Sequence, residues 1–218
     1  MNAIGEKERI AMRVAREFQD GDVVNLGIGT PTLAAGYIPE NIRVTLQSEN
    51  GILGMGPAAD GTNLDKTVIN AGGEHVTVRA GASFFDSALS FAIIRGGHLD
   101  IAVLGALEVD ERGNLASHAV PGKMMAGMGG AMDLVVGARR VLVAMTHTAK
   151  GGAPKIMKKL TLPATAIGKV SLIVTEMAVI EVTDEGLVLR EIAEGLTQEQ
   201  VRDATEATLL IGGNLKIF

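Results

Sequence analysis

The stretch VVNLGIGTP, residues 23–31, decides the fold class of this chain of 218 residues. Its first four residues are mostly apolar and predict a short buried strand. Gly27 and Gly29 then predict a tight turn, and Thr30-Pro31 is typical of a helix N-cap followed by proline at the first helical position. A strand that runs through a glycine turn into a helix is the repeating unit of layered α/β sheets.

The flanking sequence extends this pattern. Apolar residues at four-residue spacing predict a helix over residues 6–19, and alternation predicts a strand over 43–47. Ser83 and Asp86 stand at capping-box spacing and predict a helix over 83–94. The continuous apolar runs 101–104 and 141–145 are typical of buried parallel strands.

The later sequence indicates antiparallel pairing. Residues 171–183 and 186–190 predict two strands joined by a turn, while residues 48–56 predict a glycine-rich turn. Thr197 and Gln200 predict the cap of a last short helix. We therefore expect an α/β layered open sheet, mostly parallel with a late antiparallel segment, with helices on both faces, and a single domain over residues 1–218.

The composition excludes several classes of function. Aromatic residues make up only 3% of the chain and the formal net charge is −5, which argues against a nucleic-acid binder. The absence of Cys excludes a thiolate nucleophile and a disulfide framework. The sequence shows neither a membrane span nor a signal peptide, so we expect a cytoplasmic protein. The four histidines match no metal motif and are interpreted as surface or structural residues, so we expect no metal site.

Glu49 is the first candidate for chemistry. It lies at the end of a predicted strand, where α/β sheets place their active sites, and apolar residues and glycines flank it. A partly desolvated carboxylate there would be a better base or nucleophile than one in water. The local pattern leaves open the alternative that Glu49 is a turn residue that faces solvent.

The glycine-rich segment 121–133 is the second candidate. Its glycines would let backbone N–H groups converge on one point, as an oxyanion hole requires, but a flexible loop packed by its methionines fits equally well. Gly27 and Gly29 resemble a dinucleotide fingerprint whose third glycine is replaced by Thr32, so a tight turn is favoured. Asn25, taken alone, is interpreted as a backbone-capping residue. The basic run of Lys155, Lys158 and Lys159 is interpreted as a solvated face.

Together these motifs resemble the β subunit of the family I CoA-transferases, of the 3-oxoacid (acetate/butyrate–acetoacetate) group. The resemblance runs from about Ile10 to about Glu194. It rests on residues 24–29, 47–56, 69–73, 84–87, 95–98, 103–105 and 121–135. Many acetoacetate-type relatives carry Asn-Trp where this chain has Ser117-His118. Some relatives that use succinyl-CoA carry Lys where this chain has Gly73.

The resemblance implies a role for each motif. Glu49 would be the carboxylate that accepts the acyl group and then CoA, and Gly129 and Gly130 would supply oxyanion-hole backbone. The residues that would contribute to substrate binding are Asn25, Gly27, Gly29, Asn50 and Gly51.

The resemblance also implies an activity and a partner. CoA would pass between a short-chain acyl-CoA (acetoacetyl-, acetyl- or butyryl-CoA) and a carboxylic acid, by a ping-pong route through a γ-glutamyl-CoA thioester on Glu49. CoA would be substrate and covalent intermediate, with no permanently bound cofactor. An α subunit would complete the active site in a two-plus-two heterotetramer. The alternatives are a sugar-phosphate isomerase-like enzyme with Glu49 as general base, a non-catalytic nucleotide-binding module, and a structural subunit.

Overall fold

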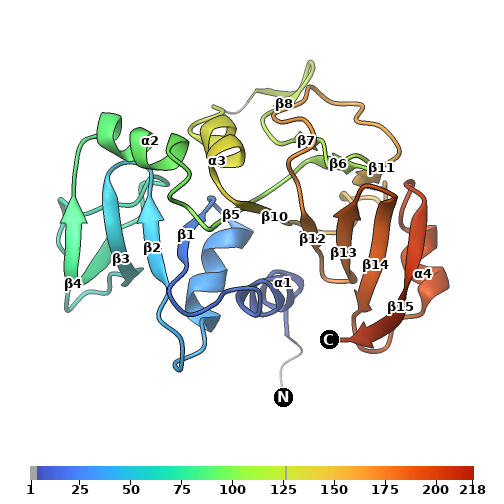
Figure 1. The fold of residues 1–218 in the computed structure, drawn as a ribbon, viewed down its shortest axis with the longest axis horizontal. Coiled ribbons are helices and arrows are strands. Elements are labelled where there is room, and N and C mark those ends of the chain that lie inside the picture. Colours follow the sequence, from blue (N-terminus) through green and yellow to red (C-terminus); the bar gives the residue numbers. More distant parts are fainter. Residues whose placement is uncertain (1–3, 126) are drawn as a thin grey trace.

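A sheet of ten strands, in the order β15-β14-β13-β12-β10-β5-β1-β2-β3-β4, runs across the protein (Figure 1). The computed structural model describes residues 4–125 and 127–218. Its five central strands are parallel. They are β2 (Thr45–Ser48), β1 (Val23–Leu26), β5 (Ile101–Leu104), β10 (Arg140–Ala144) and β12 (Leu172–Val174). The predicted buried parallel strands at 101–104 and 141–145 are thus confirmed, as is the mostly parallel α/β sheet.

Antiparallel strands flank this parallel centre on both sides. They are β3 (Ile52–Ala58) and β4 (Val76–Phe84) on one side, and β13 (Ala178–Thr183) and β14 (Gly186–Ile192) on the other, where β15 (Leu209–Ile217) adds in parallel to β14. The predicted late antiparallel segment is confirmed, although its first strand divides into β12 and β13. Neither the β3–β4 pair nor β15 was predicted from the sequence.

The prediction of a glycine-rich turn over residues 48–56 is wrong beyond its first residues. Only residues 49–51 turn, and Gly54 and Gly56 lie inside β3. Gly54 has a φ of +90° beside an irregularity in the pairing with β4. A Cβ on Gly56 would lie 2.4 Å from Oγ1 of Thr77 on β4. The glycines therefore serve a distorted strand that approaches its neighbour closely, rather than a turn.

The helices predicted over residues 6–19 and 83–94 are shorter in the structure, which has four α-helices and one 3₁₀ helix among its described residues. They are α1 (Glu6–Ala15), the 3₁₀ helix η1 (Thr30–Tyr37), α2 (Ser87–Arg95), α3 (Ala131–Gly137) and α4 (Gln198–Asp203). Ser83 is not a cap, because it lies in β4; Asp86 caps α2 by accepting a hydrogen bond from the backbone N–H of Leu89 at 2.8 Å. The cap of α4 is confirmed, since Thr197 and Gln200 exchange two side chain–backbone hydrogen bonds.

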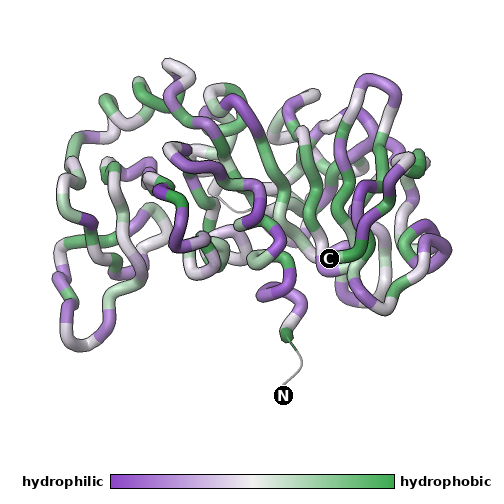
Figure 2. The backbone as a smooth tube through the Cα atoms, turned by 60° about the horizontal axis from the view of Figure 1, so that its bottom comes forward, coloured by the Kyte–Doolittle hydropathy of each residue, from purple (hydrophilic) through white to green (hydrophobic). Residues whose placement is uncertain are grey.

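Helices cover both faces of the sheet, as predicted. Alternate residues of β5 separate the two layers: Ile101 and Val103 belong to the cluster that includes α1 and η1, whereas Ala102 and Leu104 belong to the cluster that includes α2 and α3. In Figure 2 hydrophobic residues concentrate along the strands near the centre of the molecule. The continuous apolar sequence of β5 therefore reflects burial on both faces.

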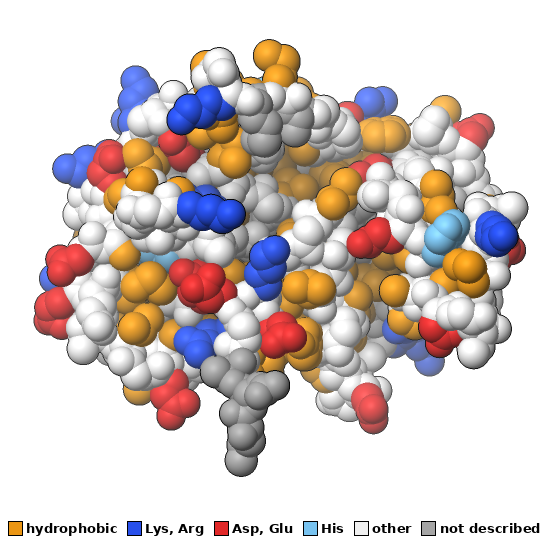
Figure 3. Space-filling model, turned by 180° about the vertical axis from the view of Figure 1, so that it is seen from behind, with side chains coloured by type: hydrophobic (Ala, Val, Ile, Leu, Met, Phe, Trp, Pro, Cys, Tyr) orange, Lys and Arg blue, Asp and Glu red, His pale blue; other side chains and the backbone are white. Residues whose placement is uncertain are grey.

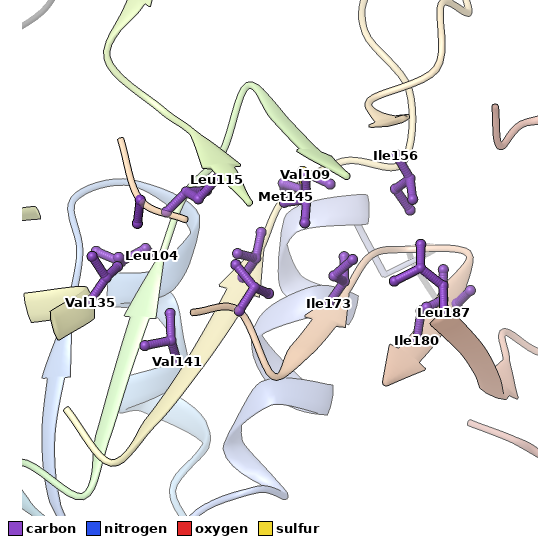
Figure 4. Packing of buried hydrophobic residues seen from close by; sticks show 14 of the residues in the cluster. Leu104, Val109, Leu115, Val135, Val141, Met145, Ile156, Ile173, Ile180 and Leu187 are labelled. Atoms are coloured by element: carbon purple, nitrogen blue, oxygen red, sulfur yellow. The ribbon is translucent and has the colours of Figure 1, made fainter. Parts of the chain in front are cut away.

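Two small sheets complete the fold. They are formed by β6 (Glu108–Asp110), β7 (Leu115–Ala116) and β11 (Ile156–Met157), and by β8 (Ala119–Val120) and β9 (Met124–Met125). Val109, Leu115 and Ile156 of the first small sheet pack into the same cluster as residues of β5, β10 and α3 (Figure 4). This packing fixes residues 105–118 above the carboxyl ends of the central strands. No helix among the described residues is long and apolar enough to span a membrane.

Candidate active site

A pocket of about 360 Å³ lies at the carboxyl ends of β1 and β5. In the sheet, β1 lies between β2, the next strand in the sequence, and β5. The strand order therefore reverses at β1, beside the pocket. Open α/β sheets place their ligands at such points. The pocket is lined by Gly27, Ile28, Glu49, Leu104–Leu107, Ser117, His118, Gly127–Ala131 and Leu134.

Glu49 follows the last residue of β2 and contributes the only carboxylate among the residues that line this pocket. Its side chain is half-buried. The side-chain amide of Asn25 on β1, whose register partner on β2 is Gln47, donates a hydrogen bond from Nδ2 to Oε2 of Glu49 at 3.0 Å. The structure thus places Glu49 in a partly desolvated pocket rather than in open solvent.

Asn25 is a buried side chain aimed at the carboxylate, not a backbone cap. Its Nδ2 atom lies 2.7 Å from Oε1 of Gln47 and 3.3 Å from the Gln47 carbonyl oxygen, in addition to its contact with Glu49. It does not line the pocket itself. The structure therefore brings Asn25 and Glu49 together through a direct side-chain hydrogen bond, although only Glu49 lines the pocket.

Gly130 is the second predicted residue that lies beside Glu49. A Cβ on Gly130 would lie 3.4 Å from Cγ of Glu49. Gly127, Gly129 and Gly130 all line the pocket, and Gly129 has a φ of +53° in the turn that leads into α3. The glycine-rich loop and Glu49 therefore line the same pocket.

Gly27 and Gly29, the two turn glycines after β1, have different positions. Gly27 lines the pocket, and its backbone N–H donates to the carbonyl of Val103 on β5 at 2.8 Å. A Cβ on Gly27 would lie 3.0 Å from that carbonyl oxygen, so glycine allows the close approach. Gly29, with a φ of +94°, precedes η1 and is exposed outside the pocket lining.

The structure gives Asn50 and Gly51 positions that shape the turn after Glu49. Nδ2 of Asn50 donates to the carbonyl of Ile69 at 2.7 Å. Gly51 has a φ of +116°, and a Cβ there would lie 1.9 Å from the carbonyl oxygen of Phe85. Neither residue lines the pocket. Both residues make contacts that hold the turn carrying Glu49.

Four polar residues near the site were not singled out as site residues from the sequence. Ser117 and His118 line the pocket, and Thr165 supports them: its Oγ1 accepts from the backbone N–H of Ser117 at 3.0 Å and lies 3.0 Å from Nδ1 of His118. Gln47 contacts Asn25 from beneath the pocket. Gln47 carried no signal in the sequence, because it falls on the polar side of the alternation over residues 43–47.

Charged side chains are otherwise sparse around the site. Lys158 and Lys159 are exposed and Lys155 is half-buried, and none of the three lines the pocket. Burial lowers the pKa of Lys155. On the face seen in Figure 3, positive and negative side chains are interspersed with hydrophobic ones. In residues 4–125 and 127–218 no group of three or more His, Asp or Glu side chains is placed to hold a metal ion.

Comparison with known proteins identifies the family of this site. The family model of coenzyme A transferases matches residues 7–204. The chain belongs to the coenzyme A transferase family. It is 54% identical over 209 residues to the beta chain of the acetate CoA-transferase of Escherichia coli K12, covering 96% of this chain and 95% of that one. It is 49% identical to one subunit of a probable succinyl-CoA:3-ketoacid coenzyme A transferase of Bacillus subtilis, covering 94% and 95%.

The fold of the transferase also matches solved structures. An acyl-CoA transferase from Escherichia coli O157:H7, crystallised as a thioester complex with CoA, superposes with a TM-score of 0.78 and 25% identity. That match covers all of this chain but only 44% of the longer one, so this transferase spans less than half of that protein. The prediction of a family I CoA-transferase β subunit is confirmed, and CoA transfer is favoured over the isomerase-like activity.

Proposed function

We propose that this transferase moves CoA by a ping-pong route in which Glu49 carries the covalent intermediate. The observation that supports it most directly is the position of Glu49, which meets an amide donor from Asn25 on one side and the loop of Gly127–Gly130 on the other. The turn of Asn50 and Gly51 and the close approach at Gly27 hold this arrangement from outside the reacting atoms.

The first half-reaction begins on the thioester carbonyl of the acyl-CoA. A carboxylate oxygen of Glu49 attacks that carbon, the C–S bond breaks, and CoA thiolate leaves behind an acyl-glutamyl anhydride. The thiolate then attacks Cδ of Glu49, the bond from Cδ to the bridging oxygen breaks, and the first acid leaves as its carboxylate. The product on the protein is a γ-glutamyl-CoA thioester.

The second half-reaction reverses these bonds. An incoming carboxylate attacks Cδ of the glutamyl thioester and displaces CoA thiolate, which then attacks the new acyl carbon and releases the Glu49 carboxylate. No proton is gained or lost over the cycle. Each step passes through a tetrahedral oxyanion, and a backbone donor aimed at it contributes typically about 3–4 kcal/mol. Gly129 and Gly130 are proposed to supply such donors.

The pocket wall is suited to this chemistry. Leu104, Leu107 and Leu134 give it an apolar side, which limits the access of water to an anhydride that would otherwise hydrolyse. Its modest volume of about 360 Å³ is compatible with the short acyl chains of acetoacetyl-, acetyl- or butyryl-CoA. CoA is proposed to be substrate and covalent intermediate only, with no permanently bound cofactor.

We further propose that residues 1–218 form one domain and that an α subunit completes the active site, as two of each subunit. The relative in Escherichia coli is named as a beta chain, and the relative in Bacillus subtilis is likewise named as one subunit of its enzyme. A single chain purified without its partner is therefore expected to be inactive. Turnover by the isolated chain at the rate of the complex would contradict this assembly.

Intact-mass analysis tests the covalent step. The complex is incubated with acetoacetyl-CoA in the absence of an acceptor acid, and this chain is expected to gain the mass of CoA less one water. Glu49→Gln should abolish both the adduct and turnover. Glu40→Gln is the matched control, because Glu40 is exposed and outside the pocket lining. An adduct that persists in Glu49→Gln would refute the role of Glu49.

A further inference from the structure

A chain of hydrogen bonds, buried except at its last link, leads from helix α2 to the Glu49 carboxylate. Nε2 of Gln47 donates to Oγ of Ser90 at 3.0 Å, and Nδ2 of Asn25 donates to Oε1 of Gln47 at 2.7 Å. The same Nδ2 donates to Oε2 of Glu49 at 3.0 Å. We call Ser90, Gln47 and Asn25 the amide relay. Only its last acceptor, Glu49, reaches the pocket.

The strand register explains how the amide relay assembles. Asn25 of β1 and Gln47 of β2 are direct partners in a parallel pair, and Asn25 is also the partner of Ala102 on β5. Paired residues share a face of the sheet, and Ala102 belongs to the apolar cluster of α2 and α3. The two amides therefore point toward α2, where Ser90 meets them.

The amide relay lies where apolar side chains would be expected. Ser90 is 0% exposed, and Gln47 and Asn25 are each 1% exposed. Buried polar groups carry a desolvation cost that is offset only when they are hydrogen-bonded. Violations of the apolar pattern are expected at functional sites, where the local arrangement serves chemistry rather than packing.

The carboxylate of Glu49 sets the direction of the hydrogen bonds. An ionised carboxylate only accepts, so Asn25 has to present its NH₂ group to it. The second N–H of that group then faces Gln47, which has to present its oxygen, and the Gln47 NH₂ group faces Ser90. In this orientation Oδ1 of Asn25 is buried and has no hydrogen-bond partner among the described residues.

The unpaired Oδ1 atom of Asn25 shows which orientation of the Asn25 amide the relay favours. Turning the Asn25 amide over would place Oδ1 against three oxygen atoms, namely Oε1 and the carbonyl of Gln47 and Oε2 of Glu49. The present orientation avoids that repulsion although it leaves an acceptor unpaired. The donor orientation of Asn25 is thus held by Gln47 as well as by Glu49.

We propose that Gln47 and Ser90 are positioning residues that hold the Asn25 amide as a donor and, through it, fix the attacking orientation of Glu49. The proposal rests on the proposed role of Glu49. Because neither Gln47 nor Ser90 lines the pocket, they act on the rate of the covalent step and not on the binding of the acyl-CoA. Small misplacements of a reacting group lower rates by up to about 100-fold.

The test measures the rate at which the CoA adduct forms on this chain in the complex, by quenched-flow intact-mass analysis with acetoacetyl-CoA. Gln47→Met removes the amide while keeping the length of the side chain, and should slow adduct formation about 10- to 100-fold. Ser90→Ala, at the far end, should slow it about 3- to 10-fold. The KM for acetoacetyl-CoA should change less than about 2-fold in both.

A double-mutant cycle separates positioning from general loosening of the fold. In an Asn25→Ala background, Gln47→Met should add less than about a 2-fold further decrease, because the residue through which it acts is gone. Multiplicative effects of the two substitutions would overturn the proposal. So would a Gln47→Met variant that forms the adduct at the parental rate.

The conservative variant Gln47→Glu tests positioning through the pH dependence of adduct formation, which a purely structural role of Gln47 would not change. Its protonated carboxyl keeps an acceptor for Asn25 and a donor for Ser90, whereas its ionised form repels Glu49. Adduct formation should therefore approach the parental rate at low pH and fall as pH rises, relative to the parent protein. A pH profile parallel to that of the parent would contradict the amide relay.

Thr205→Val is the matched stability control. Thr205 is buried and its Oγ1 lies 2.9 Å from Nε2 of His147, away from the pocket. The substitution should lower thermal stability without changing the rate of adduct formation. If Glu49→Gln abolishes the adduct while Gln47→Met is fully active, only the amide relay is refuted. If Glu49→Gln still forms the adduct, the covalent role of Glu49 and the amide relay are both refuted.

Discussion

A Cβ on Gly130, the N-cap residue of α3, would lie 3.4 Å from Cγ of Glu49 and 3.2 Å from the ring of Phe91 on α2. The backbone of the glycine-rich loop thus lies beside the Glu49 side chain, about one methyl group away from it. A methyl group on this residue would fill the space between Glu49 and Phe91. This proximity relates two motifs that are distant in the sequence.

We predict that Gly130→Ala lowers kcat of the complex at least about 10-fold, because the added methyl group displaces either Glu49 or the backbone donors that face it. The loss of stability should be below about 1 kcal/mol, since contacts at 3.2–3.4 Å require only small shifts. Steady-state kinetics and urea unfolding measure the two effects. Gly213→Ala, where a Cβ meets nothing within 4 Å, should change neither.

Gly51→Ala should affect the fold more than Gly130→Ala does. Its Cβ would lie 1.9 Å from the carbonyl oxygen of Phe85, and the φ of +116° is unfavourable for any residue with a side chain. We expect a loss of at least about 2 kcal/mol in the free energy of unfolding. Gly36→Ala is the control, because a Cβ there meets nothing within 4 Å. Equal urea midpoints for Gly51→Ala and the parent would contradict the close approach of this turn to Phe85.

The central strands could be predicted from the sequence because their signal is local. Residues 101–104 are apolar without interruption, and burial on both faces is the simplest cause of such a run. The β3 strand could not be predicted in the same way. Gly54 and Gly56 have the composition of a turn, and only their contacts with β4 show that they belong to a strand.

The candidate site likewise has features that local sequence signals predicted and features that depend on tertiary contacts. The position of Glu49 at a strand end was evident from the sequence, and the resemblance pointed to Gly130. The contact of Asn25 with Gln47 depends on the register between β1 and β2, which no local pattern encodes. His118 reaches the pocket because the small sheet places residues 115–118 above the strand ends, again through tertiary packing. The resemblance implied substrate binding for Asn50 and Gly51, and the structure adds the contacts by which both residues hold the turn that carries Glu49.

A partly buried ion-pair network that joins α1 to β14 should contribute to the stability of the protein. Arg13 of α1 donates to both oxygens of Glu191 on β14 at 2.7 and 2.8 Å, and to Glu17 at 2.9 Å. Its side chain is only 7% exposed. Arg13→Met leaves two partly buried carboxylates without this partner, and we expect a loss of about 3 kcal/mol. Urea unfolding of Arg139→Met is the comparison: Arg139 pairs with Asp100 at the surface, so its loss should be below about 1 kcal/mol.

His147 should make the stability of the protein depend on pH. It is 0% exposed, with Nδ1 2.9 Å from Oγ1 of Thr175 and Nε2 2.9 Å from Oγ1 of Thr205. Burial, and to a lesser extent the charge of Lys155, lowers the pKa of His147 from 6.5 to about 4. Because the unfolded chain takes up this proton more readily, stability is complete above pH 6.5 and is lost as pH falls toward 4.

Between pH 7 and pH 5 this residue should account for a decrease of about 2 kcal/mol in the free energy of unfolding. The measurement compares urea unfolding of the parent and of His147→Gln at both pH values. The variant should be less stable at pH 7, because it loses the hydrogen bonds of the imidazole with two threonine hydroxyls. Its free energy of unfolding should, however, decrease by about 2 kcal/mol less than that of the parent between pH 7 and pH 5. His98→Gln, which alters an exposed histidine, should keep the parental pH dependence. Parallel pH profiles for the parent and His147→Gln would mean that His147 is not held neutral in the folded state.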